Sequence, residues 1–175
     1  MSSSVLAAPT SPVPSSTEST RRQLSARQAA TVQRLTVAAV EELREHGYDG
    51  LTVRNVARAA GVAPATAYTY FTSREHLVTE VFWRRLEAMP ETRLDRRRST
   101  AARVGATMSD FALLVADEPE LAAACTVAML ATDPDVKLLR DRIGLEWRRR
   151  LGTSLVQPAA AEGLVAGLHG EEAGG

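Results

Sequence analysis

The sequence predicts an all-α protein, and three observations support this fold class. Apolar residues recur every three or four positions in each long segment after Ser25, which is the spacing of one helix face. The strict alternation of a half-buried strand and the glycine-rich loop that cradles a phosphate do not occur. Gly or Pro stands near most borders between segments, where these residues favour the ends and the starts of helices.

The first segment is a tail followed by a long helix. Ser, Thr and Pro dominate the first twenty residues, so we predict a disordered tail over residues 1–24. A helix is predicted from Ser25 to Gly47, because glycine tolerates the left-handed conformation that ends many helices. Its apolar face is expected to contain Val32, Leu35, Ala39, Val40 and Leu43.

Three further helices follow over residues 52–89. Thr52 is an N-cap for a short helix that ends at Gly61, and Pro64 suits the first position of the next. Ser73 is an N-cap for a longer helix. The first of these helices is expected to bury Val53, Val56, Ala57 and Ala60, and the last Leu77, Val78, Val81, Phe82 and Leu86.

The second half of the chain predicts three more helices. They span Ser99 to Ala116, Pro119 to Ala131, and a stretch opened by Asp133 and Pro134. The apolar face of the first is expected to contain Val104, Met108, Phe111 and Leu114 or Val115. That of the second contains Leu121, Cys125 and Met129, and that of the third Val136, Leu139, Ile143, Trp147 and Leu151. After Pro158 the large apolar residues Leu164, Val165 and Leu168 support at most one short helix.

Charge and composition limit the function classes. Residues 21–98 carry 14 Arg against 9 acidic residues, whereas the rest carries 7 cations against 12 acids. A basic half joined to an acidic half predicts an anionic partner that only one end contacts. A run of about 18 apolar residues does not occur, so no membrane span is expected. The single cysteine, Cys125, excludes an internal disulfide and favours the cytoplasm.

The stretch "TVRNVARAAGVAPATAYTYF", residues 52–71, predicts a helix-turn-helix, because two short helices flank a turn that contains glycine. At 100° per residue, Ala67 and Phe71 share the side that faces the core. The opposite side carries the small residues Ala65, Thr66 and Thr69, and its flanks carry Tyr68 and Tyr70. Such a helix fits a DNA major groove. The alternative is a corner in a plain helical bundle, with the tyrosines covering the core.

The longer stretch "LTVRNVARAAGVAPATAYTYFTSREHLVTEVF" resembles the DNA-binding domain of the tetracycline-repressor (TetR) family of transcriptional regulators. The resemblance covers roughly residues 25–86, about half of the chain. Its matching positions are Thr52, Arg54, Ala57, Ala60, Gly61, Val62, Thr66, Tyr68, Tyr70, Phe71, Ser73, Arg74 and Leu77.

The resemblance implies a role in DNA binding for nine residues. Thr52 is expected to bond a phosphate, and Arg54 to reach a base edge. Arg74, where the family usually has Lys, is expected to clamp a second phosphate. The residues expected to line the groove or hold its edges are Pro64, Ala65, Thr66, Tyr68, Thr69 and Tyr70. For Arg54 and Arg74 the alternative is ordinary solvated surface charge.

The resemblance also implies a function and a division into domains. We expect a DNA-binding domain over residues 25–86 and a helical ligand-binding and dimerisation domain over 87–175. The implied protein is a cytoplasmic, nucleoid-associated repressor that a small apolar ligand releases from an inverted-repeat operator. Family members usually end in two long helices that form the dimer, so this chain looks short and its homodimer is expected to be weak or absent.

The sequence departs from the family at one more position, and it leaves several alternatives open. Ala63 stands where the family often has Ser, a better N-cap. The residues Met108, Phe111, Leu114, Cys125, Met129 and Trp147 are candidates for a ligand pocket and equally for solid core. Neither a cofactor, a metal nor an enzymatic activity is expected, because His46, His76 and His169 are scattered. A DNA-binding protein without a ligand, or a helical interaction module without nucleic acid, are the alternative functions.

Overall fold

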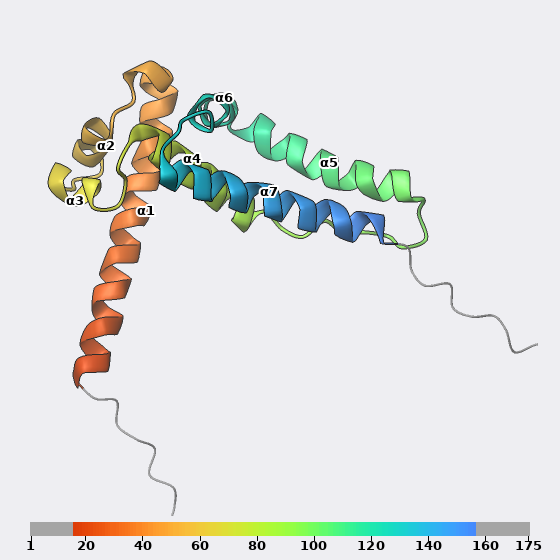
Figure 1. Cartoon of the computed structure of the whole chain (residues 1–175), viewed down its shortest axis with the longest axis horizontal. Coiled ribbons are helices and arrows are strands. Elements are labelled where there is room, and N and C mark those ends of the chain that lie inside the picture. The colour runs from red at the N-terminus through yellow and green to blue at the C-terminus, as the bar shows by residue number, and fades with distance from the viewer. Residues whose placement is uncertain (1–15, 157–175) are drawn as a thin grey trace, which may run out of the picture.

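The computed structural model describes residues 16–156, with side chains from residue 26 onward. Within that range it contains helices and no strand, which confirms the all-α prediction (Figure 1). The expected short helix near Leu164 and Leu168 lies outside the described residues. The helices are α1 (Ser16–Gly50), α2 (Val53–Ala59), α3 (Pro64–Tyr68), α4 (Arg74–Ala88), α5 (Thr100–Asp117), α6 (Pro119–Ala128) and α7 (Pro134–Leu155).

Helix α1 begins earlier than predicted and is interrupted where predicted. It starts at Ser16, inside the expected tail, because the run from Glu18 to Leu24 is rich in residues with good helix propensity. At Gly47 the backbone turns to φ 65°, which confirms the left-handed residue there. The first half of α1 projects beyond the rest of the molecule (Figure 1), and among residues 26–50 of this helix the first fully buried side chain is Leu35.

One continuous core joins the helix-turn-helix to the helices behind it. The apolar faces predicted for α1, α2 and α4 are buried, with Val32 and Ala60 only partly so. Helix α6 adds Leu121 and Cys125 to the same core, and α7 adds Ile143. Helices α2 and α3 therefore rest on a core that α6 and α7 help to build.

Helices α5 and α7 run side by side away from this core (Figure 1). The Phe111 and Trp147 rings meet edge to face between them, 4.1 Å apart. The face predicted for α5 is wrong in part, because α5 buries Arg103 and Thr107, whereas Met108 is 45% exposed. The reason is a polar contact: the Arg103 guanidinium donates to the carbonyl of Ser154 at 3.0 Å near the end of α7.

A second buried arginine fixes the end of α4 onto α7. The Arg150 guanidinium donates to the carbonyls of Met89 at 2.9 Å and Pro90 at 3.0 Å, and its Nε donates to Glu146 at 2.6 Å. Bonds from Arg149 and Arg150 lower the pKa of Glu146 to about 2. Carbonyls at a helix end lack partners within the helix, so α4 ends at a defined place on α7.

Candidate nucleic-acid interface

Helix α2 begins with the side-chain cap that the sequence predicted. Thr52 has extended backbone angles, and its Oγ1 accepts a hydrogen bond from the Asn55 amide at 3.0 Å. The Thr52 side chain is exposed, so its hydroxyl proton can still be donated outward. The N-terminus of a helix carries partial positive charge. This end of α2 therefore offers a donor and a favourable field to an anion.

The turn between α2 and α3 orients the second helix of the motif. Gly61 has φ 62°, and the Val62 amide donates to the Ala57 carbonyl at 2.8 Å. Pro64 occupies the first position of α3. Ala67 and Phe71 are buried, as predicted, and they anchor α3 on the core.

The opposite side of α3 faces away from the protein. Pro64, Ala65, Thr66 and Thr69 are all exposed, and the Thr69 hydroxyl donates to the Thr66 carbonyl at 2.6 Å. The two tyrosines differ, because Tyr68 is 49% exposed whereas Tyr70 is partly buried against the core. The outer surface is therefore small and flat, with one phenol standing at its edge.

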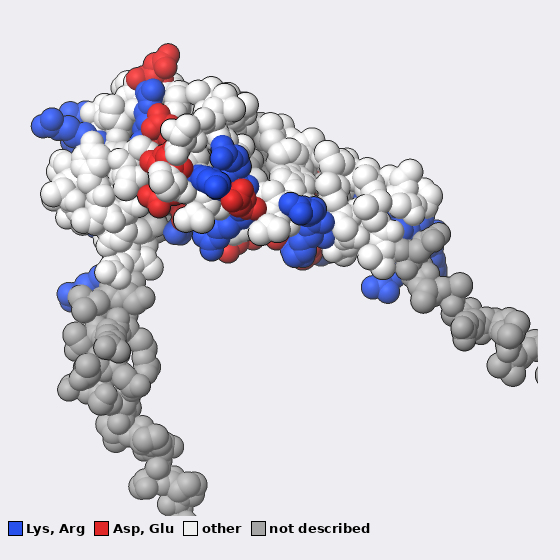
Figure 2. Space-filling model, viewed as in Figure 1, with Lys and Arg blue, Asp and Glu red and all other residues white. Residues whose placement is uncertain are grey.

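Charge lies beside α3 and not on it. Residues 61–71 contain no charged side chain, and uncharged surface covers α3 while Lys and Arg atoms lie over α2 (Figure 2). Arg54 is exposed on α2. Arg58, which the sequence analysis did not single out, donates to the Asn55 side chain at 3.2 Å. An uncharged face flanked by guanidinium groups matches a surface that meets base edges between phosphates.

Arg74 is held by contacts that the sequence analysis missed. Its guanidinium lies over the Tyr48 ring at 4.4 Å, and its Nη1 donates to the Tyr48 carbonyl at 3.1 Å. The Tyr48 hydroxyl and Arg74 Nε both donate to Glu75 Oε1 at 3.0 Å. Burial and the bond to Glu75 raise the pKa of Tyr48 to about 12. Tyr48 is 27 residues from Glu75, so no local pattern marks this group.

Helix α3 lacks the side-chain cap that α2 has. Ala63 has the extended backbone of an N-cap, φ −60° and ψ 134°, but supplies no side-chain acceptor. Only Pro64, which needs no amide partner, favours the start of the helix there. The departure noted at Ala63 is thus a missing hydrogen bond in the structure.

The six residues proposed for a ligand pocket or, equally, for solid core lie in different surroundings. Cys125 is fully buried in the core, and burial raises the pKa of its thiol to about 12, whereas reactive cysteines are exposed and have a lowered pKa. Phe111 and Trp147 pack on each other, Met129 packs against the core and Met108 points to the exterior. None of these five residues lines the open groove between the end of α4 and α5.

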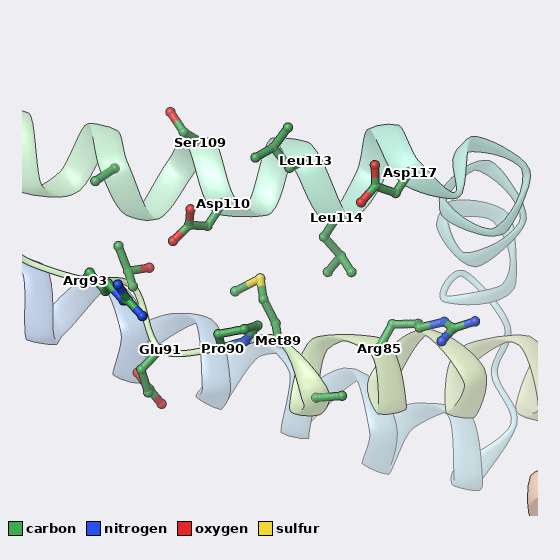
Figure 3. A pocket seen from close by; sticks show the side chains of 13 residues that line it. Arg85, Met89, Pro90, Glu91, Arg93, Ser109, Asp110, Leu113, Leu114 and Asp117 are labelled. Atoms are coloured by element: carbon green, nitrogen blue, oxygen red, sulfur yellow. The ribbon is translucent and has the colours of Figure 1, made fainter.

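An open groove of about 770 Å³ lies between the end of α4 and α5. Figure 3 shows Leu114 and Asp110 of α5 pointing into it toward Met89 and Pro90. Leu114 is the one residue shared with the predicted set. Sequence periodicity could not find the groove, because the segment after α4 supplies one wall. Among the described residues no cluster of three His, Cys, Asp or Glu side chains could hold a metal ion.

Comparisons with known proteins identify the helix-turn-helix region. A model of bacterial regulatory proteins of the tetR family matches residues 35–81, from α1 into α4. Uncharacterised HTH-type transcriptional regulators of Mycobacterium bovis (strain ATCC BAA-935 / AF2122/97) and Mycobacterium tuberculosis (strain ATCC 25618 / H37Rv) are each 45% identical over 172 residues. Each alignment covers 96% of this chain and 79% of the relative.

One solved structure supports the fold. A TetR transcriptional regulator from Rhodococcus sp. RHA1 superposes with a TM-score of 0.60 at 23% identity, over 71% of this chain and 70% of that chain. None of the helices in residues 16–156 is long and apolar enough to cross a membrane.

The missing cap of α3 gives a testable prediction. Ala63→Ser is expected to stabilise the protein by about 0.5–1 kcal/mol, because a serine oxygen can accept a hydrogen bond from the free amides at the start of α3. Urea unfolding of both proteins measures the change. Ala65→Ser, two residues into the same helix, is the matched control and should leave the unfolding free energy nearly unchanged. An unaltered midpoint for Ala63→Ser shows that Pro64 alone already fixes the turn.

Proposed function

The chain belongs to the TetR family of bacterial transcriptional regulators, and from this premise we propose that it is a ligand-released repressor of an inverted-repeat operator. Membership in the family makes it a DNA-binding regulator of transcription. The finer proposal is that it acts in the cytoplasm, as a homodimer, on nucleoid DNA. One observation carries the proposed binding to an operator: α3 presents a small, uncharged, exposed face while Ala67 and Phe71 anchor its other side in the core.

The face of α3 fits direct contact with base pairs. A major groove about 12 Å wide admits an α-helix, and side chains as small as Ala65 and Thr66 let the helix backbone lie close to the bases. The exposed Tyr68 ring can pack on a sugar or on a thymine methyl group. Arg54, exposed on α2, is the guanidinium that we assign to a base edge, where Arg most often pairs with guanine.

The remaining charged and capping residues are assigned to the DNA backbone. The hydroxyl of Thr52 and the amides at the start of α2 are placed to bind one phosphate. Arg74 lies at the start of α4, and its contacts with Tyr48 and Glu75 hold it beside the α3–α4 turn. Phosphate contacts fix the position of a protein on the duplex without reading its sequence.

A homodimer follows from the small size of α3. A helix of five residues covers few base pairs, and specific complexes bury roughly 1,000 Å² of protein surface or more. Two such helices, about 34–36 Å apart on one face of the duplex, meet this requirement at an inverted repeat. We therefore assign the operator two half-sites.

The ligand is assigned to the groove between the end of α4 and α5. Its volume, about 770 Å³, lies within the range of small-molecule sites, roughly 300–1,000 Å³. Met89 and Leu114 supply apolar surface, and Asp110 supplies a polar group (Figure 3). Because one wall belongs to the segment that Arg150 holds at the end of α4, a molecule bound there acts directly on α4.

Replacing Arg54 and replacing Arg74 are expected to weaken DNA binding in different ways. Arg54→Ala should cost about 1–3 kcal/mol on the cognate duplex and relax one base preference in each half-site. Arg74→Ala should weaken binding to all sequences alike and lower the salt slope by about one unit per subunit, because it removes a phosphate contact. Titrations of cognate and scrambled duplexes at several salt concentrations separate the two outcomes. Arg148→Ala, which removes an exposed arginine of α7, is the control.

If Arg54→Ala lost the same binding free energy on cognate and on scrambled DNA, Arg54 would not contact a base edge. Arg74 also packs on Tyr48, so an unfolding curve of Arg74→Ala must accompany its titration.

The spacing of the two half-sites tests whether two chains bind the operator as a dimer. A duplex with two half-sites one helical turn apart should bind two chains cooperatively. Moving one half-site by about five base pairs, half a turn, places the sites on opposite faces of the duplex and should abolish the cooperativity. Sedimentation of the protein with each duplex measures the stoichiometry. Binding of two chains that is indifferent to this change would contradict the proposed dimer.

A further inference from the structure

Two carboxylates at the start of α7 hold the turn that follows α3. Ser73 Oγ donates to Asp133 Oδ2 at 3.1 Å, and Thr72 Oγ1 lies 3.3 Å from Asp133 Oδ2 and 3.3 Å from Asp135 Oδ2. Thr72 and Ser73 lie between α3 and α4, about 60 residues before the two acids. The contact therefore joins the DNA-binding end of the chain to its C-terminal helices.

The two oxygens of Asp133 have separate partners. Oδ1 accepts from the Asp135 amide at 2.8 Å and caps α7, whereas Oδ2 accepts from Ser73 and Thr72. Burial alone raises the pKa of Asp133, but the bonds from Asp135, Ser73, Val136 and Thr72 outweigh it and lower the pKa. Capping of α7 needs one oxygen only, so the second oxygen serves the α3–α4 turn.

Asp135 extends the junction toward α3 through His76. His76 Nδ1 lies 3.6 Å from Asp135 Oδ2 and 3.2 Å from Thr72 Oγ1. The imidazole meets the Phe71 ring edge to face at 5.5 Å. Phe71 is buried, and its amide donates to the Ala67 carbonyl in α3 at 3.0 Å. Contacts thus run without a gap from α7 to the helix that we assign to the major groove.

We propose that Asp133 and Asp135 are positioning residues for DNA binding, which hold the α3–α4 turn so that α3 and α7 move together. The proposal rests on α3 being the helix that contacts DNA. Carboxylates beside a DNA-binding surface repel phosphates and reduce affinity. An acid that raises DNA affinity in this place does so by positioning, because its charge acts in the opposite direction.

Variants can separate the two functions of Asp133. Asp133→Ser keeps a good N-cap for α7 but removes the oxygen that reaches Ser73 and Thr72. Thr72→Val removes the partner hydroxyl with little change of shape and leaves the Ser73 cap of α4 intact. Asp141→Ser removes an exposed acid further along α7 and controls for the loss of charge.

The first measurement is affinity for a duplex that the wild-type protein selects from a randomised pool. Asp133→Ser and Thr72→Val should each weaken binding by about three- to tenfold, the size of a coupling between residues in contact. The double variant should lose less affinity than the sum of the two single losses, because Thr72 and Asp133 share one contact while Thr72 also reaches Asp135. Asp141→Ser should bind as the wild type or more tightly. Unchanged or tighter binding by Asp133→Ser, or losses that add in the double variant, would overturn the proposal.

The second measurement needs no DNA. In the free protein, amide hydrogen exchange over residues 66–72 should become faster in Asp133→Ser while residues 136–143 keep their protection. Equal exchange in both proteins would also overturn the proposal. If the wild type selects no duplex, the proposed DNA function fails, and the exchange experiment alone decides whether the junction positions α3.

Discussion

The orientation of α3 depends on one backbone conformation, the left-handed turn at Gly61. A Cβ atom built on Gly61 meets nothing within 4 Å, so space would admit a side chain there. The φ of 62° is what favours glycine. With the turn fixed, Ala67 and Phe71 face the core, and the small side chains of Ala65, Thr66 and Thr69 must face outward. The surface offered to DNA is thus a consequence of what the other side of α3 buries.

Helix α4 transmits this arrangement to the rest of the molecule, because α7 holds it at both ends. At its start, Asp133 accepts hydrogen bonds from Thr72 and Ser73. At its end, Arg150 donates to the carbonyls of Met89 and Pro90. The groove assigned to the ligand begins at this second contact. Under the proposed function, a molecule bound in the groove and a duplex bound at α3 act on opposite ends of the same helix.

The helix-turn-helix could be predicted from the sequence because its signals are local. Thr52 and Ser73 cap their helices within three residues, and Gly61 and Pro64 act through their own backbones. The burial of α5 could not be predicted, since Arg103 is fixed by a carbonyl 51 residues away. Arg150 and Tyr48 are similar cases, with partners 60 and 27 residues away. The spacing of apolar residues predicted that Met108 is buried, because this spacing reflects only the apolar character of side chains and not the hydrogen bonds that they make.

Protection of α3 by DNA is the most direct measurement of the central claim, that the outer face of α3 meets the major groove. Cys125 is buried and its thiol pKa is raised to about 12, so a cysteine placed on the surface becomes the reactive one. Ala65→Cys should react with a maleimide in the free protein and lose most of that reactivity in the complex with operator DNA. Arg148→Cys, on exposed α7, should react equally in both states. Undiminished labelling of Ala65→Cys in a saturated complex would contradict the account.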